Sequence, residues 1–133
     1  MRDKCPYDFS FVVPAFNEEG LLGQTLMSLE KCMERAKEYR GEIVVVDNNS
    51  NDRTAEIAKA RGVKVVFEPH NQISRARNHG ATQSMGENLF FVDADTLVSP
   101  DLFLDALELL KGGSCGAGGS LPVSYTHLRA HET

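Results

Sequence analysis

Four short apolar runs alternate with segments of helical periodicity, and this alternation constrains the fold more than any other feature of the sequence. The runs are rich in Val, Ile and Phe, as strands buried on both faces of a parallel sheet are. They occupy residues 9–13, 43–46, 63–67 and 89–92. Helical periodicity covers about 18–39, 53–61, 73–84 and 100–110. The order predicts an α/β fold with a mostly parallel sheet and helices on both faces, because connections between such elements are short and right-handed.

Polar side chains follow each predicted strand at its carboxyl end. The pairs, in chain order, are Asn17 and Glu18, Asp47 and Asn48, Glu68 and His70, and Asp93 and Asp95. Parallel strands bring all these ends to one edge of the sheet, which is where ligands bind in open α/β folds. More polar groups meet there than helix capping requires, so we expect a binding site at this edge.

The fourth run leads directly into Asp93-Ala94-Asp95. Two carboxylates this close repel each other unless a positive group lies between them. A divalent cation suits hard oxygen ligands, and a cation held by one or two carboxylates takes its other ligands from water and phosphates. We interpret this stretch as the metal and diphosphate end of a nucleotide site. The alternative is that the two acids cap the turn that follows the strand.

Turn and capping residues support the predicted boundaries. Asn17 is placed to cap the helix over 18–39, and Pro14 is expected to end the first strand. Ser99 and Pro100 form an N-cap and a first-position proline for the last helix. Gly80, among other small residues, indicates a helix that lies close against the sheet.

The composition is that of a soluble globular protein, with 41% hydrophobic and 25% charged residues among 133, enough for one domain. A net charge of -5 argues against a nucleic-acid partner, which would require a basic surface. No apolar segment approaches the roughly 20 residues that span a bilayer, and the N-terminus lacks a signal-peptide core. We therefore expect a cytoplasmic protein without a membrane segment in this chain. Peripheral membrane association stays open for a longer parent protein.

The three cysteines, Cys5, Cys32 and Cys115, are widely spaced and include no Cys-x-x-Cys pair. Neither a disulfide framework nor a zinc site is indicated. We expect reduced, packed thiols.

The composition changes after the last predicted helix. Residues 112–120 are rich in glycine and could include a further strand, whereas 121–133 show neither helical nor strand periodicity. We assign 1–120 to one domain. The irregular tail over 121–133 is typical of adapter read-through and is excluded from the fold.

Four segments, 12–19, 44–52, 76–80 and 91–95, resemble in order and spacing the nucleotide-sugar-binding half of family 2 glycosyltransferases. The resemblance covers about residues 8–110. It implies a Rossmann-like, three-layer nucleotide-diphospho-sugar transferase fold, truncated here. It also implies an inverting enzyme that transfers a sugar from a nucleotide-diphosphate donor.

The resemblance also implies roles for residues that would contact the nucleotide. Pro14, Phe16 and Glu18 match the segment that lines the nucleoside, with Phe16 against the base or ribose. Asp47 matches the acid that accepts a hydrogen bond from the base, and its alternative role is to cap a turn. Arg77 matches a basic residue near the phosphates. Arg75 could take that role, and either arginine could instead be a solvated helix-face charge.

Asp93, Ala94 and Asp95 match the family's Asp-x-Asp motif, which contacts the ribose and a divalent metal, Mn2+ or Mg2+. Asp95 is the expected direct ligand, with Asp93 beside it. The sequence departs from the family at Asn48, where many members carry a second acid.

The mechanism implied by the family is a single displacement. An acceptor hydroxyl attacks the anomeric carbon from the face opposite the diphosphate, and a carboxylate removes its proton. We expect this general base beyond the present chain. The acceptor is unknown and could be a lipid, a polysaccharide or a protein glycan. The fragment is expected to bind a nucleotide sugar weakly through a metal and to transfer nothing unaided.

Two other functions fit the predicted fold. A sugar-nucleotide pyrophosphorylase would carry a Gly-rich, basic loop after the first strand, where this chain has an acidic one. A receiver-type signalling domain would use Asp47 or Asp93 as phosphoacceptor, but it requires a late strand ending in Lys-Pro, which is absent from the sequence.

Overall fold

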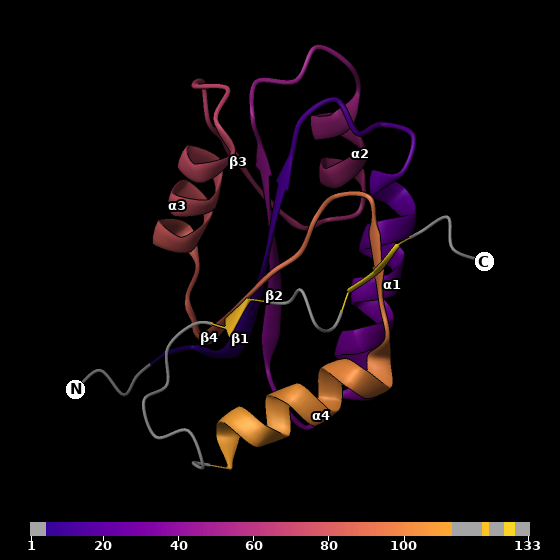
Figure 1. Ribbon diagram of the computed structural model, residues 1–133, viewed down its shortest axis with the longest axis vertical. Coiled ribbons are helices and arrows are strands. Elements are labelled where there is room, and N and C mark those ends of the chain that lie inside the picture. The colour runs from indigo at the N-terminus through magenta and orange to yellow at the C-terminus, as the bar shows by residue number, and fades with distance from the viewer. Residues whose placement is uncertain (1–4, 113–120, 123–126, 130–133) are drawn as a thin grey trace.

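The computed structural model describes residues 5–112, 121–122 and 127–129. The four predicted strands and four predicted helices follow one another in the expected order (Figure 1). The elements are β1 (Tyr7–Ala15), α1 (Leu22–Arg35), β2 (Gly41–Asp47), α2 (Thr54–Ala60), β3 (Lys64–Phe67), α3 (Ile73–Gln83), β4 (Gly86–Phe91), β5 (Thr96–Val98), α4 (Pro100–Lys111), β6 (Leu121–Pro122) and β7 (His127–Arg129). The short strand β5, which lies between β4 and α4, is not predicted from the sequence. No helix in this described part is long and apolar enough to cross a membrane.

The main sheet has the strand order β3-β2-β1-β4-β6, and all of its neighbouring strands are parallel. A small antiparallel pair joins β5 and β7. Helix α3 covers one face of the sheet, and α1 and α2 lie on the other side (Figure 1). The predicted mostly parallel α/β fold is confirmed. The strand ends that carry the polar residues therefore do share one edge.

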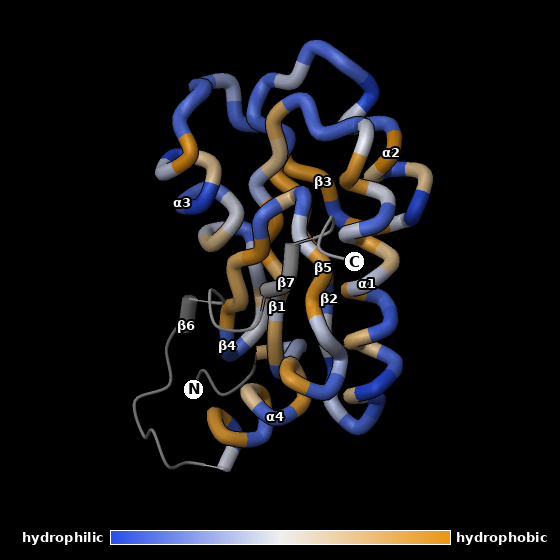
Figure 2. Tube along the Cα trace, turned by 45° about the vertical axis from the view of Figure 1, so that its right-hand side comes forward, coloured by the Kyte–Doolittle hydropathy of each residue, from blue (hydrophilic) through white to orange (hydrophobic). Residues whose placement is uncertain are grey.

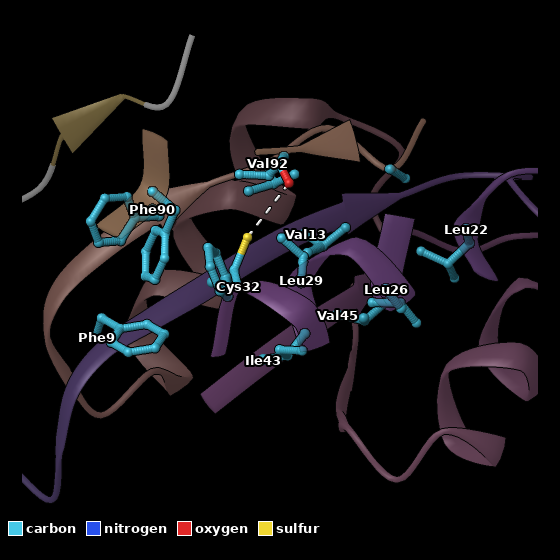
Figure 3. Close-up of a cluster of buried hydrophobic side chains, with 14 of the residues drawn as sticks. Phe9, Val13, Leu22, Leu26, Leu29, Cys32, Ile43, Val45, Phe90 and Val92 are labelled. Atoms are coloured by element: carbon cyan, nitrogen blue, oxygen red, sulfur yellow. Dashed lines mark hydrogen bonds between the residues drawn. The ribbon is translucent and has the colours of Figure 1, made fainter. Parts of the chain in front are cut away.

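The face covered by α1 and α4 holds the larger part of the core, which Figure 3 shows in part. Four phenylalanine rings pack edge to face or tilted, with centroids 4.8 to 6.5 Å apart: Phe9, Phe11, Phe90 and Phe103. Such ring packing stabilises beyond the area it buries. Three of these rings belong to β1 and β4, so the two strands that lead to the predicted site are tightly packed in the core.

The face covered by α3 is thin by comparison. Its buried cluster is Val12, Val46 and Ala76, with Phe91 packed against it. A Cβ atom added at Gly80 would lie 2.5 Å from Val12 Cγ1 and 2.8 Å from Val46 Cγ2. The predicted close approach of this helix to the sheet is confirmed, and only glycine permits it.

The loop between β1 and α1 differs from the prediction. Helix α1 begins at Leu22 rather than near Glu18, and Asn17 does not cap it. Asn17 instead has a φ of 52°, in the left-handed region that asparagine tolerates better than most residues, and its side chain accepts the Asn51 N–H at 2.7 Å. The contact to the β2–α2 loop competes with capping and delays the start of the helix.

The sequence predicts that Pro14 ends β1. In the structure Pro14 lies within this strand. Val12 C=O accepts the Val92 N–H, and Ala15 C=O accepts the Asn48 N–H, so alternate residues face β4 and β2. Pro14 therefore faces the β4 side, beyond the last pairing of Val12 with Phe91. The missing proline N–H costs nothing there, because β4 has already left the ladder.

Other local predictions have mixed outcomes. The Ser99 side chain caps α4 by accepting the Leu102 N–H, and Pro100 is in the first turn, as predicted. Cys32 is buried, and burial raises the pKa of its thiol to about 12, whereas Cys5 is exposed rather than packed. Cys115 and the rest of 113–120 lie outside the described residues.

Two short strands, β6 and β7, lie within 121–133, where the sequence predicts an irregular tail. Each has two or three residues, too few for periodicity to reveal. The domain boundary at residue 120 and the foreign origin of residues 121–133 stay predictions.

Candidate functional site

A cavity of about 340 Å³ opens at the carboxyl edge of the sheet. The loop after β4 supplies three of its lining residues and the end of β1 with its following loop supplies four. The full lining is Pro14, Ala15, Phe16, Glu18, Asn48, Ile73, Asp93, Ala94 and Asp95. Six of the eight residues predicted for the site thus line one cavity, and Asp47 and Arg77 do not. Figure 2 shows that the loops around this edge are mainly hydrophilic, in contrast to the strands below.

The β1–α1 loop is hydrogen-bonded to the loop after β2 and to the start of α2. Ser50 Oγ accepts the Asn17 N–H at 2.9 Å, and Thr54 Oγ1 accepts the Glu18 N–H at 2.8 Å. Phe16 keeps 47% of its surface exposed beside the cavity. An apolar ring left this accessible at a cavity wall is suited to stacking against a planar ligand group.

The electrostatics of the cavity are acidic. Burial, and next to it the negative charges of Asp95, Asp52 and Asp93, raise the pKa of Glu18 above its usual value. Within the described residues, neither Glu18, Asp93 nor Asp95 pairs with a lysine or arginine. A site of this kind attracts a cation.

The donor set at this edge suits Mg2+ or Mn2+, which prefer oxygen ligands. The described part of the chain contains no group of three or more His, Cys, Asp or Glu residues arranged to hold a metal. A cation bound by Asp93 and Asp95 would therefore take its remaining ligands from water or from a phosphate.

The backbone of the Asp-x-Asp segment is fixed from three directions. The Val92 N–H bonds Val12 C=O at 2.9 Å, and the Thr96 N–H bonds Asp93 C=O at 3.2 Å. Thr25 Oγ1 donates to Ala94 C=O at 2.7 Å from the buried face of α1. Ala94 is consequently buried, whereas Asp93 is exposed and Asp95 partly so.

Asp47 lies at the end of β2 with only 7% of its surface exposed. Its Oδ1 accepts the Ser50 N–H at 3.0 Å, which is the turn-capping contact considered above. Its second oxygen has no hydrogen bond within the described residues. Capping a turn and binding a base do not exclude each other at this residue.

Asn48 lines the cavity; the sequence placed it at this edge of the sheet but gave it no specific role in the site. Its Nδ2 donates to Glu68 C=O at 3.1 Å and His70 C=O at 2.6 Å, and Asn71 Nδ2 donates to Asn48 C=O at 2.6 Å. An aspartate here could not donate to either carbonyl. Asparagine at this position, where many family members carry an acid, therefore joins the loop after β2 to the loop after β3.

Ile73, at the start of α3, was also missed, although it lines the cavity with 59% of its surface exposed. The signal available from the sequence is an apolar residue at the first position of a predicted helix, but such residues are common. The cavity wall on this side is therefore partly apolar.

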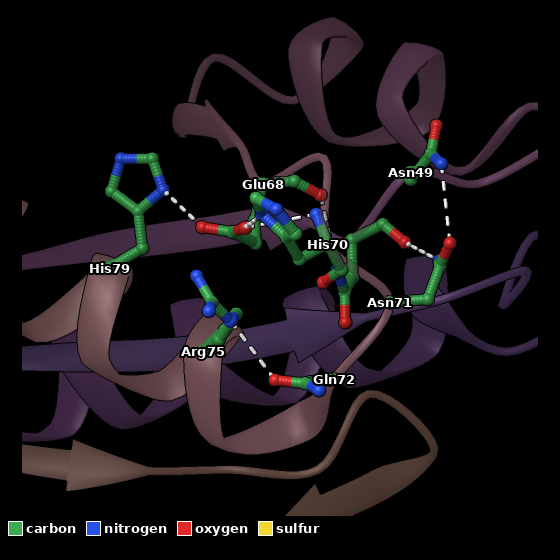
Figure 4. A network of polar contacts seen from close by, with 8 residues as sticks. Asn49, Glu68, His70, Asn71, Gln72, Arg75 and His79 are labelled. Carbon is green, nitrogen blue, oxygen red and sulfur yellow. Dashed lines mark hydrogen bonds and ion pairs between the residues drawn. The ribbon is translucent and has the colours of Figure 1, made fainter.

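The two arginines considered for the phosphates lie on α3 outside the cavity lining. The Arg77 guanidinium lies 5.8 Å from the centroid of the Phe91 ring, a cation–π geometry. Arg75 Nε donates to Gln72 Oε1 at 3.0 Å (Figure 4). Both are exposed, so a role at the phosphates stays a prediction for each.

Glu68 organises the loop between β3 and α3, with His70 and His79 on either side (Figure 4). Its carboxylate accepts the His70 N–H at 2.9 Å and contacts the imidazoles of His70 and His79 at 3.2 and 3.1 Å. The His70 N–H foremost, followed by the two imidazoles, lowers the pKa of Glu68. This carboxylate, unlike those in the cavity, is already engaged by the protein.

The sequence model of Glycosyl transferase family 2 matches residues 10–129. The chain belongs to glycosyl transferase family 2. Among curated relatives of this family, the 4,4'-diaponeurosporenoate glycosyltransferase of Staphylococcus haemolyticus is 33% identical over 105 residues, which are 74% of this chain and 27% of that protein. The match does not favour the pyrophosphorylase or receiver interpretations.

Two solved structures of family 2-like fold overlay most of the chain. S. aureus TarS in complex with UDP-GlcNAc has a TM-score of 0.68 and 30% identity, over 79% of this chain and 31% of that one. The mannosyltransferase PcManGT from Pyrobaculum calidifontis, in complex with GDP-Man and Mn2+, has a TM-score of 0.68 and 25% identity, over 78% of this chain and 32% of that one. The chain thus spans about a third or less of the length of these proteins.

Proposed function

We propose that this chain forms the donor-binding part of an inverting, metal-dependent glycosyltransferase that uses a nucleotide-diphosphate sugar. The observation that carries the proposal is the convergence of Glu18, Asp93 and Asp95 on one cavity without a protein cation among the described residues. The similar mannosyltransferase was solved with GDP-Man and Mn2+, and TarS with UDP-GlcNAc. Both facts support a charged donor bound through a divalent metal.

The roles at the site follow from position and chemistry. Phe16 packs against the base or ribose, and the free oxygen of Asp47 accepts a hydrogen bond from the base. Glu18 and Asp93 accept hydrogen bonds from ribose hydroxyls. Asp95, partly buried and backed by α1, is the direct metal ligand, with Asp93 beside it. Arg77 would reach a phosphate by leaving the Phe91 ring.

The chemistry divides between this chain and the rest of its parent protein. A divalent cation held by Asp95 and Asp93 would offset the charge that grows on the leaving diphosphate. Glu18, Asp93 and the bound cation would together hold the donor so that its anomeric carbon is presented to an acceptor hydroxyl. The general base and the acceptor site lie in other sequence of the parent, so the fragment alone transfers no sugar.

Calorimetric titration of the purified chain with UDP-glucose, UDP-GlcNAc and GDP-mannose tests the proposal. We expect at least one donor to bind in the presence of Mn2+ and to lose binding when EDTA removes the metal. Asp105 is exposed on α4 and does not line the cavity, so Asp105→Asn is a control that should bind donors as the wild type does. Binding that is equal with and without metal, or absent for all three donors, would contradict the proposal. Sugar transfer by the fragment would contradict the proposal that the general base and the acceptor site lie elsewhere in the parent protein.

A further inference from the structure

One face of α1 carries a line of small polar side chains within an otherwise apolar buried surface. Thr25, Ser28 and Cys32 are spaced three and four residues apart, which places them on the same side of the helix. Thr25 and Cys32 are fully buried, and Ser28 is partly so. We call these three residues the polar seam. Leu22, Leu26 and Leu29 surround it.

The polar seam bonds to the chain that follows β4. Thr25 Oγ1 donates to Ala94 C=O at 2.7 Å, and Ser28 Oγ accepts the Val98 N–H at 3.2 Å. Cys32 Sγ donates to Val98 C=O at 3.6 Å, the bond drawn in Figure 3. The seam therefore contacts both ends of segment 94–98.

Residues 94 and 95 need partners because the chain has left the main sheet there and the antiparallel pairing of β5 with β7 begins only at Thr96. The pairing of β1 with β4 ends at Phe91, and the Val92 N–H makes the last bond to β1. A buried carbonyl without a partner is costly, and Ala94 is 4% exposed. The Thr25 hydroxyl supplies that partner at the residue between the two acidic side chains. A hydrophobic residue of the same shape would pack at position 25 but would leave Ala94 C=O unpaired.

We propose that Thr25 is a positioning residue for the Asp93 and Asp95 carboxylates, and this inference rests on the proposed function. By fixing Ala94 C=O against α1, Thr25 sets the backbone from which both acids project before a donor arrives. Groups that support metal ligands in this way typically change metal affinity about 10- to 100-fold when removed. The polar seam thereby connects the buried face of α1 to the part of the cavity where Asp93 and Asp95 lie.

The test compares Thr25→Val, which keeps the shape and loses the hydroxyl, with Thr25→Ser, which keeps the hydroxyl. Amide hydrogen exchange is measured first, without ligand. We expect faster exchange over 94–98 in Thr25→Val, little change in Thr25→Ser, and no change in β2. Thr82→Val is a matched control, because its hydroxyl bonds Asn78 C=O within α3. Val45→Ala, in the core of β2, controls for general destabilisation.

Calorimetry with Mn2+ and the best donor follows on the same variants. We expect about a tenfold weaker affinity for Thr25→Val and restoration to within about threefold for Thr25→Ser. Wild-type affinity together with wild-type exchange over 94–98 in folded Thr25→Val would overturn the inference. Equal weakening in Val45→Ala would do so as well.

Two further outcomes separate this inference from the function it rests on. If the wild type binds no donor, the proposed function fails, and exchange over 94–98 still decides the role of Thr25. If Thr25→Val does not fold, Thr25→Ala, which also removes the hydroxyl that bonds Ala94 C=O, takes its place in the exchange experiment. Unchanged exchange over 94–98 in Thr25→Ala would then overturn the inference.

Discussion

The two edges of the sheet use acidic residues in opposite ways. At the amino edge, Lys111 Nζ lies 2.9 Å from Asp8 Oδ1 and 2.8 Å from Glu87 Oε1, so one cation serves two acids. Glu42 accepts the Ser10 hydroxyl at 2.6 Å and the Met85 N–H at 2.7 Å. At the carboxyl edge, the acids of the cavity have no such partner in the described chain.

The size of a hollow does not distinguish these edges. An opening of about 560 Å³ at the amino edge, larger than the cavity at the carboxyl edge, is lined by Glu30, Glu42 and Arg61 among others. Arg61 binds Glu30 through two hydrogen bonds of 3.0 and 2.8 Å. Glu42 and Lys64, which also line this opening, hydrogen-bond Ser10, the Met85 N–H and Gln83 C=O. The larger opening therefore has its charged groups engaged by the protein, and we take engagement rather than volume as the guide to a candidate ligand site.

The largest expected effect is the loss of donor binding when Asp95 is substituted. We expect Asp95→Asn to weaken Mn2+-dependent donor binding by at least about 100-fold, because the proposed direct metal ligand loses its charge. The free protein should be no less stable, since the substitution removes a negative charge from a group that already repels Glu18. Calorimetry and urea unfolding measure the two effects. A loss of stability that matches the loss of binding would mean that Asp95 serves the fold, as the amino-edge acids do.

Glu42 should give the reverse result. Glu42→Ala leaves the Met85 N–H and the Ser10 hydroxyl without their acceptor, and we expect a loss of about 1–3 kcal/mol in the free energy of unfolding. Donor affinity at the far edge should stay unchanged. Glu42→Gln, which keeps one acceptor oxygen, is the control and should lose less. Weaker donor binding in folded Glu42→Ala would show that the edges are coupled.

The smallest expected effect is the stability that the amino edge loses at acidic pH. Burial alone would raise the pKa of Asp8, but hydrogen bonds from the Arg40 N–H and Lys111 outweigh it and hold the pKa below its usual 3.8. Since the folded-state pKa is lowered, this contribution to stability is complete above 3.8 and is lost as the pH falls through the folded-state value. Urea midpoints should therefore fall less below about pH 4 in Asp8→Asn than in the wild type. Parallel curves for the two proteins would exclude this contribution.

The elements that were predicted correctly depend on local signals. Ser99 and Pro100 cap α4 within four residues of chain, and the valines of β2 need only a buried strand to accommodate them. Gly80 was interpretable because glycine within a helix is costly unless a close contact requires it. Each signal and its cause lie in one short segment.

The parts that were missed depend on partners far along the chain. Asn17 follows a capping pattern, but Asn51 engages its side chain instead. Thr25 looks like any polar residue on an amphipathic helix until the fold brings Ala94 to it from 69 residues away. The role of Asn48 depends similarly on the loop after β3. Sequence could therefore indicate which carboxylates meet, but not which residues hold them in place.

The close packing of α3 at Gly80 links the rear of this helix to the width of the cavity. A methyl group at position 80 would overlap Val12 and Val46, which stand in the centre of the sheet and cannot easily move aside. The helix would have to lift, and Ile73 at its first turn would move with it away from the opposite wall. A single carbon added behind the helix would thus act as a wedge that enlarges the cavity at the carboxyl edge without altering any residue inside it.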